Sequence, residues 1–288
     1  MASNKVASLI TDRIIAELEK GNIPWQKPWT GTASGPISHV SGKPYSLVNQ
    51  FVLGRPGEYI TYKQCIAEGG KVKKRAKALP VIFYKMNVYT DTDPDTGEEI
   101  EKTIPVLRFY TVYHIDDCEG IKAKFAKETK PVTAKQACRK AENIIKRYQR
   151  LNDTLRIHND SESDEAFYRP STDEIVVPMM SQYEATEEYY STLFHEMTHS
   201  TGHASRLNRL DKKAAFGNKE YSKEELVAEI GAATLVNVCG IETTKSFRNS
   251  AAYIQSWMRA LKKDPNLLIS ASAKAEKAVE YILRTKKA

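Results

Sequence analysis

The sequence lacks several features that would place it in a membrane or outside the cell. No apolar run in its 288 residues reaches the roughly 18 positions that a membrane-spanning helix needs. The first residues, MASNKVASLITDRI, lack the apolar core and small-residue cleavage site of a secretory signal. Its four cysteines, Cys65, Cys118, Cys138 and Cys239, form no CxxC pair. We therefore expect a cytoplasmic protein with reduced thiols rather than a disulfide scaffold.

Acidic residues are scarce in the first third of the chain. Residues 1–90 carry 13 Lys+Arg against 5 Asp+Glu, a balance of +8, and the remainder carries 30 against 31, a balance of −1. The net charge of +7 thus belongs to the N-terminal third, which suggests contact with a polyanion there. A merely solubilising surface is the alternative. Hydrophobic residues make up 41%, too many for a disordered chain.

Hydrophobic periodicity predicts mixed helices and strands in the N-terminal part. Residues 5–20 show apolar positions at helical spacing, and Gly21 follows them. Residues 58–70 are predicted as a short helix stopped by two glycines. Segments 78–90 and 103–115 are rich in β-branched and aromatic residues, so we expect two strands joined by an acidic loop.

The remainder of the chain is predicted to be mostly helical with a small sheet. Helical patterns cover 133–151, 184–203, 221–240, 250–263 and 266–284, and strand patterns cover 154–160 and 167–178. Thr133 and Ser222 are the expected N-caps of two of these helices, and Gly240 the expected stop of the second. The predicted fold class is α+β. Its basic N-terminal α+β domain spans residues 1–125, and its mostly helical domain spans residues 126–288.

The stretch STLFHEMTHSTGH, residues 191–203, carries the strongest chemical signal. On a helix, residues four apart share a face, so His195 and His199 can aim their imidazoles at one point with Glu196 beside it. This HExxH arrangement holds Zn²⁺ through its two histidines and uses the glutamate as general base. Two solvated surface histidines are the alternative. We expect Zn²⁺, or another divalent cation such as Mn²⁺.

A catalytic zinc site needs a third protein ligand, and the segment EELVAEIGAATL offers Glu225 and Glu229. By analogy with glutamate-type zincins, Glu225 binds the metal and Glu229 orients a histidine, although the spacing also fits the reverse assignment. His203 is expected at the rim of the site. Tyr221 is a candidate for stabilising an oxyanion.

If the site is hydrolytic, zinc lowers the pKa of its bound water to about 7 and Glu196 accepts the proton. The segment 167–178 would then supply an edge strand for an extended peptide.

Basic and aromatic residues interleave in the N-terminal part, most densely around KVKKRAK at residues 71–77. Such a mixture suits single-stranded DNA, because cations follow the phosphates and rings stack on unpaired bases. A localisation signal or a solvated loop would explain the basic run equally well, and core packing would explain each ring. The candidate DNA contacts are Trp25, Lys27, Trp29, Tyr45, Asn49, Tyr62, Lys63, Gln64, Lys71, Lys73, Lys74 and Arg75.

Several stretches together resemble the ArdC-type antirestriction proteins of conjugative plasmids. They are ITDRIIAELEKGNIPWQKPW, GKPYSLVNQFVL, YITYKQCIAEGGKVKK, VIFYK and HEMTHSTGHASRLNR. The resemblance implies an N-terminal domain that binds single-stranded DNA and a C-terminal zincin-like metallopeptidase domain. It also implies protection of incoming plasmid DNA from host restriction during conjugation. Where relatives tend to read VRKGEKG, this chain reads VKKRAKA, so the backbone of that loop is expected to differ.

Three functions fit these observations. The chain is a DNA-binding antirestriction protein with a zinc peptidase site that acts on a host restriction protein, an antirestriction protein with a catalytically silent zincin scaffold, or a metalloprotease that cleaves DNA-bound proteins.

Overall fold

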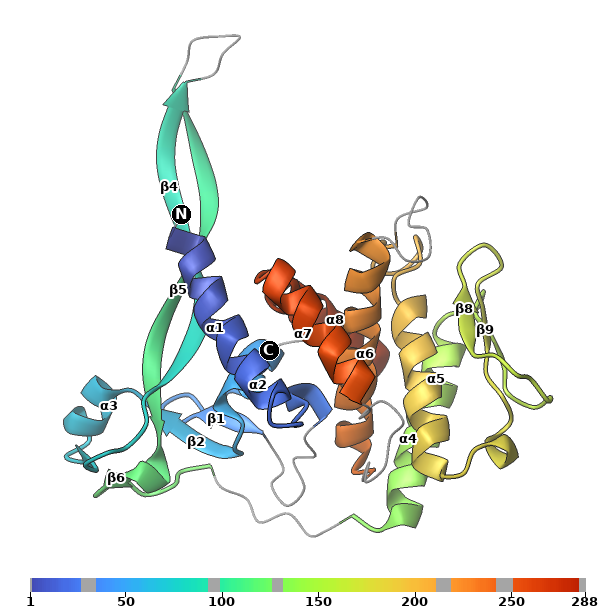
Figure 1. Ribbon diagram of the computed structural model, residues 1–288, viewed down its shortest axis with the longest axis horizontal. Coiled ribbons are helices and arrows are strands. Elements are labelled where there is room, and N and C mark those ends of the chain that lie inside the picture. The colour runs from blue at the N-terminus through green and yellow to red at the C-terminus, as the bar shows by residue number, and fades with distance from the viewer. Residues whose placement is uncertain are drawn as a thin grey trace.

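The computed structural model describes residues 2–26, 35–92, 99–125, 132–210, 219–241 and 251–284 (Figure 1). It confirms the predicted α+β class. The N-terminal elements are α1 (Ala2–Leu18), a 3₁₀ turn (Pro24–Gln26), β1 (Pro36–Ser38), α2 (Leu47–Leu53), β2 (Gly57–Ile60), α3 (Tyr62–Ala67), β3 (Lys71–Val72), β4 (Leu79–Thr92), β5 (Glu99–His114), a second 3₁₀ turn (Ile115–Asp117) and β6 (Cys118–Glu119). None of the described helices is both long and apolar enough to cross a bilayer.

A four-stranded sheet in the order β1-β2-β5-β4 organises this part. The predicted strands 78–90 and 103–115 form the long antiparallel hairpin β4–β5, which extends far from the rest of the molecule (Figure 1). The prediction for residues 58–70 was wrong in its first part. Residues 57–60 form β2 because Tyr59 and Ile60 pair with β5 and are buried. The helix begins only at Tyr62, where Thr61 and Gln64 form a capping box.

The C-terminal elements are α4 (Ala134–Arg150), β7 (Arg156–His158), β8 (Phe167–Arg169), β9 (Glu174–Val176), a 3₁₀ turn (Met180–Gln182), α5 (Thr186–Ser200), α6 (Lys219–Cys239), α7 (Ala251–Lys263) and α8 (Leu267–Leu283). Thr133 caps α4 and Gly240 follows α6 with a φ of 78°, as predicted. Ser222 is not the cap of α6, because that helix begins at Lys219 and Ser222 lies in its first turn. Segment 167–178 forms two strands, β8 at the sheet edge and β9 at its centre.

The two halves of the chain share a hydrophobic core. One buried cluster joins Ile10 and Phe51 of the N-terminal part to Leu226 and Leu261 of α6 and α7. Within it, the Trp25 ring meets those of Phe51 and Trp257 edge-on, with centroids 6.4 and 6.5 Å apart. Figure 1 shows α7 and α8 lying between α1 and α6. The predicted division at residue 125 therefore does not separate two independent cores.

A buried ion pair attaches the small sheet to the C-terminal end of α5. Arg206 Nη1 donates to Asp173 Oδ2 at 3.0 Å, and a second Arg206 nitrogen binds the other carboxylate oxygen. Thr154 and the Tyr168 hydroxyl also donate to Asp173, and Arg206 Nε donates to the Ser200 carbonyl. Burial raises the pKa of Asp173, but these hydrogen bonds outweigh burial and lower it from 3.8 to about 2.

Because the folded state lowers this pKa, Asp173 stabilises the protein above pH 3.8, and the contribution disappears as the pH falls towards 2. We expect Asp173→Asn to remove on the order of 2 kcal/mol of acid-sensitive stability in that window. Urea unfolding at a series of pH values measures it. Asp160→Asn, at an exposed position, serves as the control. If both variants follow the wild-type pH profile, the Asp173 pair does not stabilise the sheet in this way.

Candidate metal centre

Helix α5 presents both histidines of the HExxH motif from consecutive turns. Glu187 and Glu188 lie in its first turn, where negative charge favours the helix dipole. Leu193 and Phe194 anchor the same helix in the core. The Nε2 atoms of His195 and His199 are 3.1 Å apart, so the two rings converge as the four-residue spacing predicts.

Helix α6 supplies the third donor group. Glu225 Oε2 lies 3.5 Å from His195 Nε2, and Glu225 Oε1 lies 3.4 Å from His199 Nε2. Donor atoms of a tetrahedral zinc ion, each about 2.0–2.1 Å from it, lie about 3.3–3.4 Å from one another. The separations of 3.1, 3.4 and 3.5 Å therefore fit a single cation between these three side chains. Among the described residues, this trio is the group whose donor atoms all lie within 4.8 Å of one another.

Two further glutamates of α6 face the far sides of the imidazoles. Glu229 Oε1 lies 3.5 Å from His195 Nδ1, and Glu224 Oε1 lies 3.3 Å from His199 Nδ1. A carboxylate at Nδ1 fixes the tautomer of the ring and leaves Nε2 free for a metal. The geometry thus places Glu225 among the candidate ligands and Glu229 behind His195.

Sequence reasoning missed Glu224 and its partner Arg209. Arg209 Nε donates to Glu224 Oε2 at 3.0 Å and Nη2 donates to Glu224 Oε1 at 2.8 Å. The same guanidinium donates to Thr201 Oγ1 and to the Thr198 carbonyl near the end of α5. Arg209 therefore connects α5 to Glu224 of α6. Glu224 precedes Glu225 directly in the sequence, but helical spacing alone did not indicate which neighbour of Glu225 would reach a histidine.

The pKa values of these groups reflect their mutual contacts. Burial lowers the pKa of the His199 imidazole, but its hydrogen bonds to Glu224 and Glu225 outweigh burial and raise the pKa to about 10. Burial raises the pKa of Glu225, and the hydrogen bonds from His195 and His199 outweigh it and bring that pKa far below its usual range. The lowered pKa values keep the Glu224 and Glu225 carboxylates ionised at neutral pH, so the cluster favours a cation, which would compete with the proton on His199.

Close packing of α5 and α6 makes this convergence possible. A Cβ at Gly231 would lie only 2.5 Å from Thr198 Cγ2, so a side chain there would push the helices apart. Thr198 is fully buried, and its hydroxyl donates to the Phe194 carbonyl within α5. The glycine thus lets α6 approach closely enough for Glu225 to reach both histidines.

The remaining residues of the predicted site have different positions. Glu196 is 7% exposed and lies close enough to His199 to raise the pKa of that imidazole. His203 lies beyond the end of α5 and shares a turn with Ser205, to which its Nδ1 is hydrogen-bonded at 2.8 Å. The Tyr221 side chain lies outside the described residues.

The chain resembles known proteins over nearly its whole length. Residues 4–113 match the N-terminal domain of anti-restriction factor ArdC, and residues 146–274 match the zincin-like metallopeptidase family. The metal-free crystal structure of the antirestriction protein ArdC from plasmid R388 is 32% identical, covers 98% of this chain and 99% of its own, and has a TM-score of 0.70. The chain belongs to the ArdC antirestriction family.

A second structure of the R388 protein and a longer protein from Escherichia coli extend the comparison. The Mn(II)-bound structure of the R388 protein is 30% identical, covers 96% of this chain and 97% of its own, and has a TM-score of 0.72. An Escherichia coli protein named DNA primase TraC is 35% identical over 294 aligned residues, or 95% of this chain. Our chain spans only 26% of that primase.

Two of the predicted DNA contacts need correction. Trp25 is 1% exposed and packs between Phe51 and Trp257, so its ring has no face available for a base. Asn49 is buried and bridges α2 to β4, because its amide donates to the Ile82 carbonyl at 2.9 Å and accepts from the Ile82 N–H at 2.8 Å. Tyr45 is only half-buried and lies beside Tyr59. Lys27 and Trp29 lie outside the described residues.

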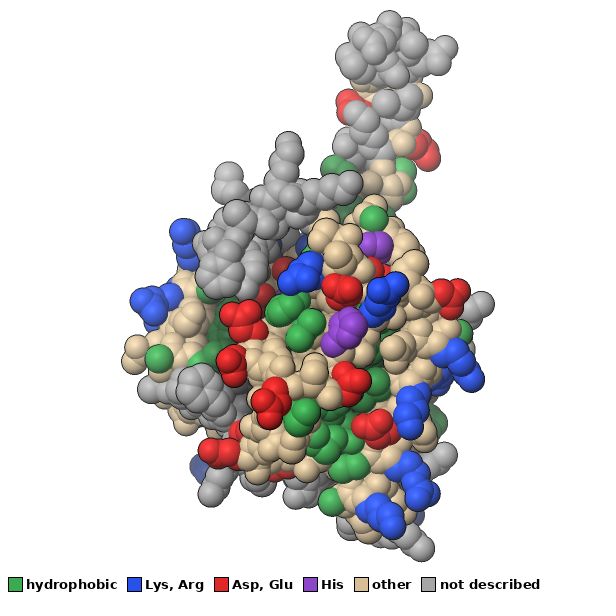
Figure 2. Space-filling model, turned by 90° about the vertical axis from the view of Figure 1, so that its right-hand side faces the viewer, with side chains coloured by type: hydrophobic (Ala, Val, Ile, Leu, Met, Phe, Trp, Pro, Cys, Tyr) green, Lys and Arg blue, Asp and Glu red, His purple; other side chains and the backbone are tan. Residues whose placement is uncertain are grey.

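The remaining candidates gather on α3 and on β3 with the turn that follows it. Six are exposed: Tyr62, Lys63, Lys71, Lys73, Lys74 and Arg75. Gln64 is less available, because its side chain accepts from the Thr61 N–H in the capping box. Figure 2 shows that the face carrying α5 and the small sheet instead mixes cationic and anionic side chains. The exposed residues of α3, β3 and the turn after it are mainly cationic, whereas the face with α5 is mixed in charge, which agrees with the concentration of positive charge in residues 1–90.

We expect Arg209→Ala to weaken divalent-cation binding about tenfold or more, because Glu224 would no longer be held against His199. Isothermal titration with Mn²⁺ and with Zn²⁺ measures the effect. Arg259→Ala, which removes an exposed arginine from α7, is the matched control and should bind as the wild type does. Equal affinities for both variants would mean that Glu224 does not support the site.

Proposed function

We propose that this chain is an antirestriction protein that binds single-stranded DNA, holds a divalent cation in a zincin-type centre and protects incoming plasmid DNA from host restriction during conjugation. The observation that carries the proposal is the convergence of His195, His199 and Glu225 in a chain that matches an antirestriction protein over almost all of both lengths. The Mn(II)-bound state of that relative supports a divalent cation here as well.

The donor set gives each residue a distinct task. His195, His199 and Glu225 would hold the cation, and Glu224 and Glu229 orient the two imidazoles through their Nδ1 atoms. A divalent cation held there would polarise a carbonyl oxygen and acidify water. The Glu196 carboxylate is positioned next to His195 on α5 and would accept a proton and return it to a leaving amine.

Glu196→Gln tests whether this chemistry is used. We expect the variant to keep DNA and Mn²⁺ affinities within about twofold, because a carboxamide of the same shape removes only the proton acceptor, and to lower peptide cleavage by about 100-fold or more. Plasmid survival in a restricting recipient gives the biological readout, with Glu187→Gln as the control on the same helix.

Loss of protection together with cleavage supports a peptidase role in antirestriction. Full protection by Glu196→Gln would instead identify the zincin fold as a silent scaffold. Cleavage of DNA-bound proteins in general, without any effect on restriction, would favour a DNA-associated protease.

The DNA half of the proposal rests on the exposed cations around β3. We expect alanine at Lys73, Lys74 and Arg75 to weaken binding to a single-stranded oligonucleotide and to reduce the salt slope by about 0.7 per lost phosphate contact. Affinities at a series of salt concentrations measure both effects. Alanine at Lys135, Arg139 and Lys146 removes the same charge from exposed positions on α4 and is the control. An unchanged slope in the first variant would place the DNA elsewhere.

A further inference from the structure

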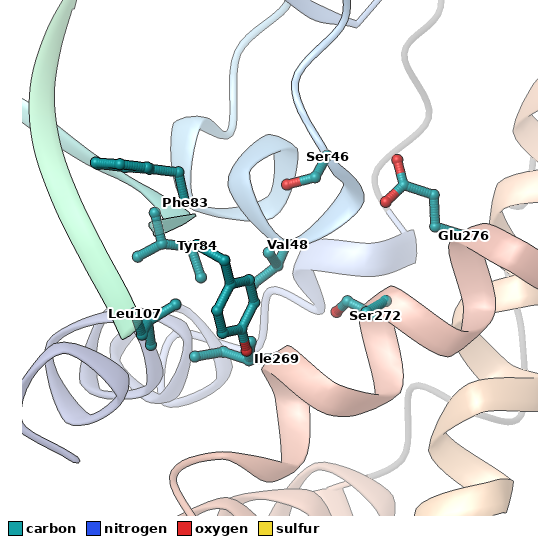
Figure 3. A pocket seen from close by; sticks show the side chains of 10 residues that line it. Ser46, Val48, Phe83, Tyr84, Leu107, Ile269, Ser272 and Glu276 are labelled. Carbon is teal, nitrogen blue, oxygen red and sulfur yellow. The ribbon is translucent and has the colours of Figure 1, made fainter. Parts of the chain in front are cut away.

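A cavity of about 300 Å³ lies where the base of the β4–β5 hairpin meets α2 and α8 (Figure 3). None of its lining residues belongs to the metal centre. Its lining residues come from segments that are distant in the sequence, for example Ser46, Tyr84 and Ser272. Its volume is at the lower end of the range for small-molecule sites, which limits an occupant to one ring system or one side chain.

The walls of the cavity are apolar and aromatic. Leu107, Val48 and Ile269 are buried and line its inner part. The ring of Tyr84 stands in the cavity between Leu107 and Ser272, although 57% of this residue is exposed (Figure 3). An exposed aromatic ring beside an apolar wall favours a flat occupant that can stack.

Ser272 is the observation that points to a ligand. This residue is 1% exposed, yet its Oγ has no hydrogen-bond partner among the described residues. Buried hydroxyl groups in folded proteins are nearly always paired, so an orphan that lines a cavity indicates a polar atom supplied by an occupant. Ser46 Oγ accepts from Asn49 Nδ2 at 3.0 Å, which leaves its own O–H able to donate to the same occupant.

Glu276 completes the polar side of the cavity. It lies one turn beyond Ser272 on α8 and brings a carboxylate to the lining (Figure 3). A carboxylate accepts hydrogen bonds from N–H groups and repels phosphate. An aliphatic side chain in the cavity would leave the Ser272 hydroxyl unpaired. A flat ring with a polar edge would satisfy the apolar walls and the Ser272 hydroxyl together. The carboxylate of Glu276 has several acceptor positions and can take a further N–H from the same edge in addition to the interaction it already makes.

We propose that this cavity receives one unpaired nucleobase with an exocyclic amino group, stacked on Tyr84, with its edge at Ser272 and Glu276. This inference rests on the proposed binding of single-stranded DNA. The position is reachable from the basic segment, because Tyr84 follows the start of β4 by about 17 Å of strand.

Oligothymidylate with one central 2-aminopurine tests the proposal, because stacking on Tyr84 quenches the fluorescence of this amino-bearing base. For the wild type we expect quenching by about half or more. We also expect the oligonucleotide to bind at least about threefold more tightly when its central base is cytosine or guanine instead of thymine. Tyr84→Ala should abolish the quenching and the base preference, and Tyr84→Phe, which keeps the ring, should retain the quenching.

Ser272→Ala tests the orphan hydroxyl. It should reduce the preference for amino-bearing bases about threefold while leaving thermal stability unchanged or higher, since it removes an unpaired buried group. Ser270→Ala, at an exposed position of the same helix, is the control.

The outcomes separate this inference from the proposed function. If the wild type binds no single-stranded DNA, both fail. If it binds DNA but neither quenches 2-aminopurine nor distinguishes the bases, or if the Tyr84 and Ser272 variants behave as wild type, DNA binding stands and the base site is refuted. In that case the cavity would be a candidate for a side chain of a protein partner.

Discussion

The close approach of α5 and α6 is the constraint on which the candidate site depends. At the point where Gly231 faces Thr198, there is no room for a side chain on α6. That proximity brings glutamate oxygens from α6 within 3.3–3.5 Å of both nitrogens of each imidazole, so carboxylates surround the two rings. Arg209 reinforces the arrangement because it contacts the end of α5 and Glu224 of α6 with one guanidinium. The Arg209–Glu224 ion pair and the close contact of Gly231 with Thr198 therefore both hold α6 against α5.

The shared core connects the helix that carries part of the candidate site to the N-terminal part of the chain. Trp25 precedes the sheet in sequence, yet it packs against Trp257 of α7, and the same cluster contains Leu226 of α6. One residue before Leu226 lies Glu225, so the helix that carries a candidate ligand also buries its apolar side against the N-terminal part. The R388 antirestriction protein is similar to this chain over both parts together.

Sequence patterns predicted the long elements well, because their hydrophobic periods are set by local geometry. The hairpin strands, α4 with its Thr133 cap and the two site helices appeared where expected. Short elements were harder to predict. Helix α2 has seven residues, six of them buried, so it lacks the polar side that makes a helix recognisable. β2 was missed because its strand character comes from pairing with β5, a partner more than fifty positions away.

The sequence by itself determined that the imidazoles of His195 and His199 share one side of a helix, because residues four apart on a helix must do so, and that Glu196 lies next to them, one position round the helix. It also determined where positive charge concentrates. Tertiary structure decided which carboxylate joins the histidines, that Glu224 and Arg209 support them, and that Trp25 and Asn49 serve the core. It also built the cavity at Ser272. These features depend on contacts between segments far apart in the chain, and no local period encodes which side chains such contacts bring together.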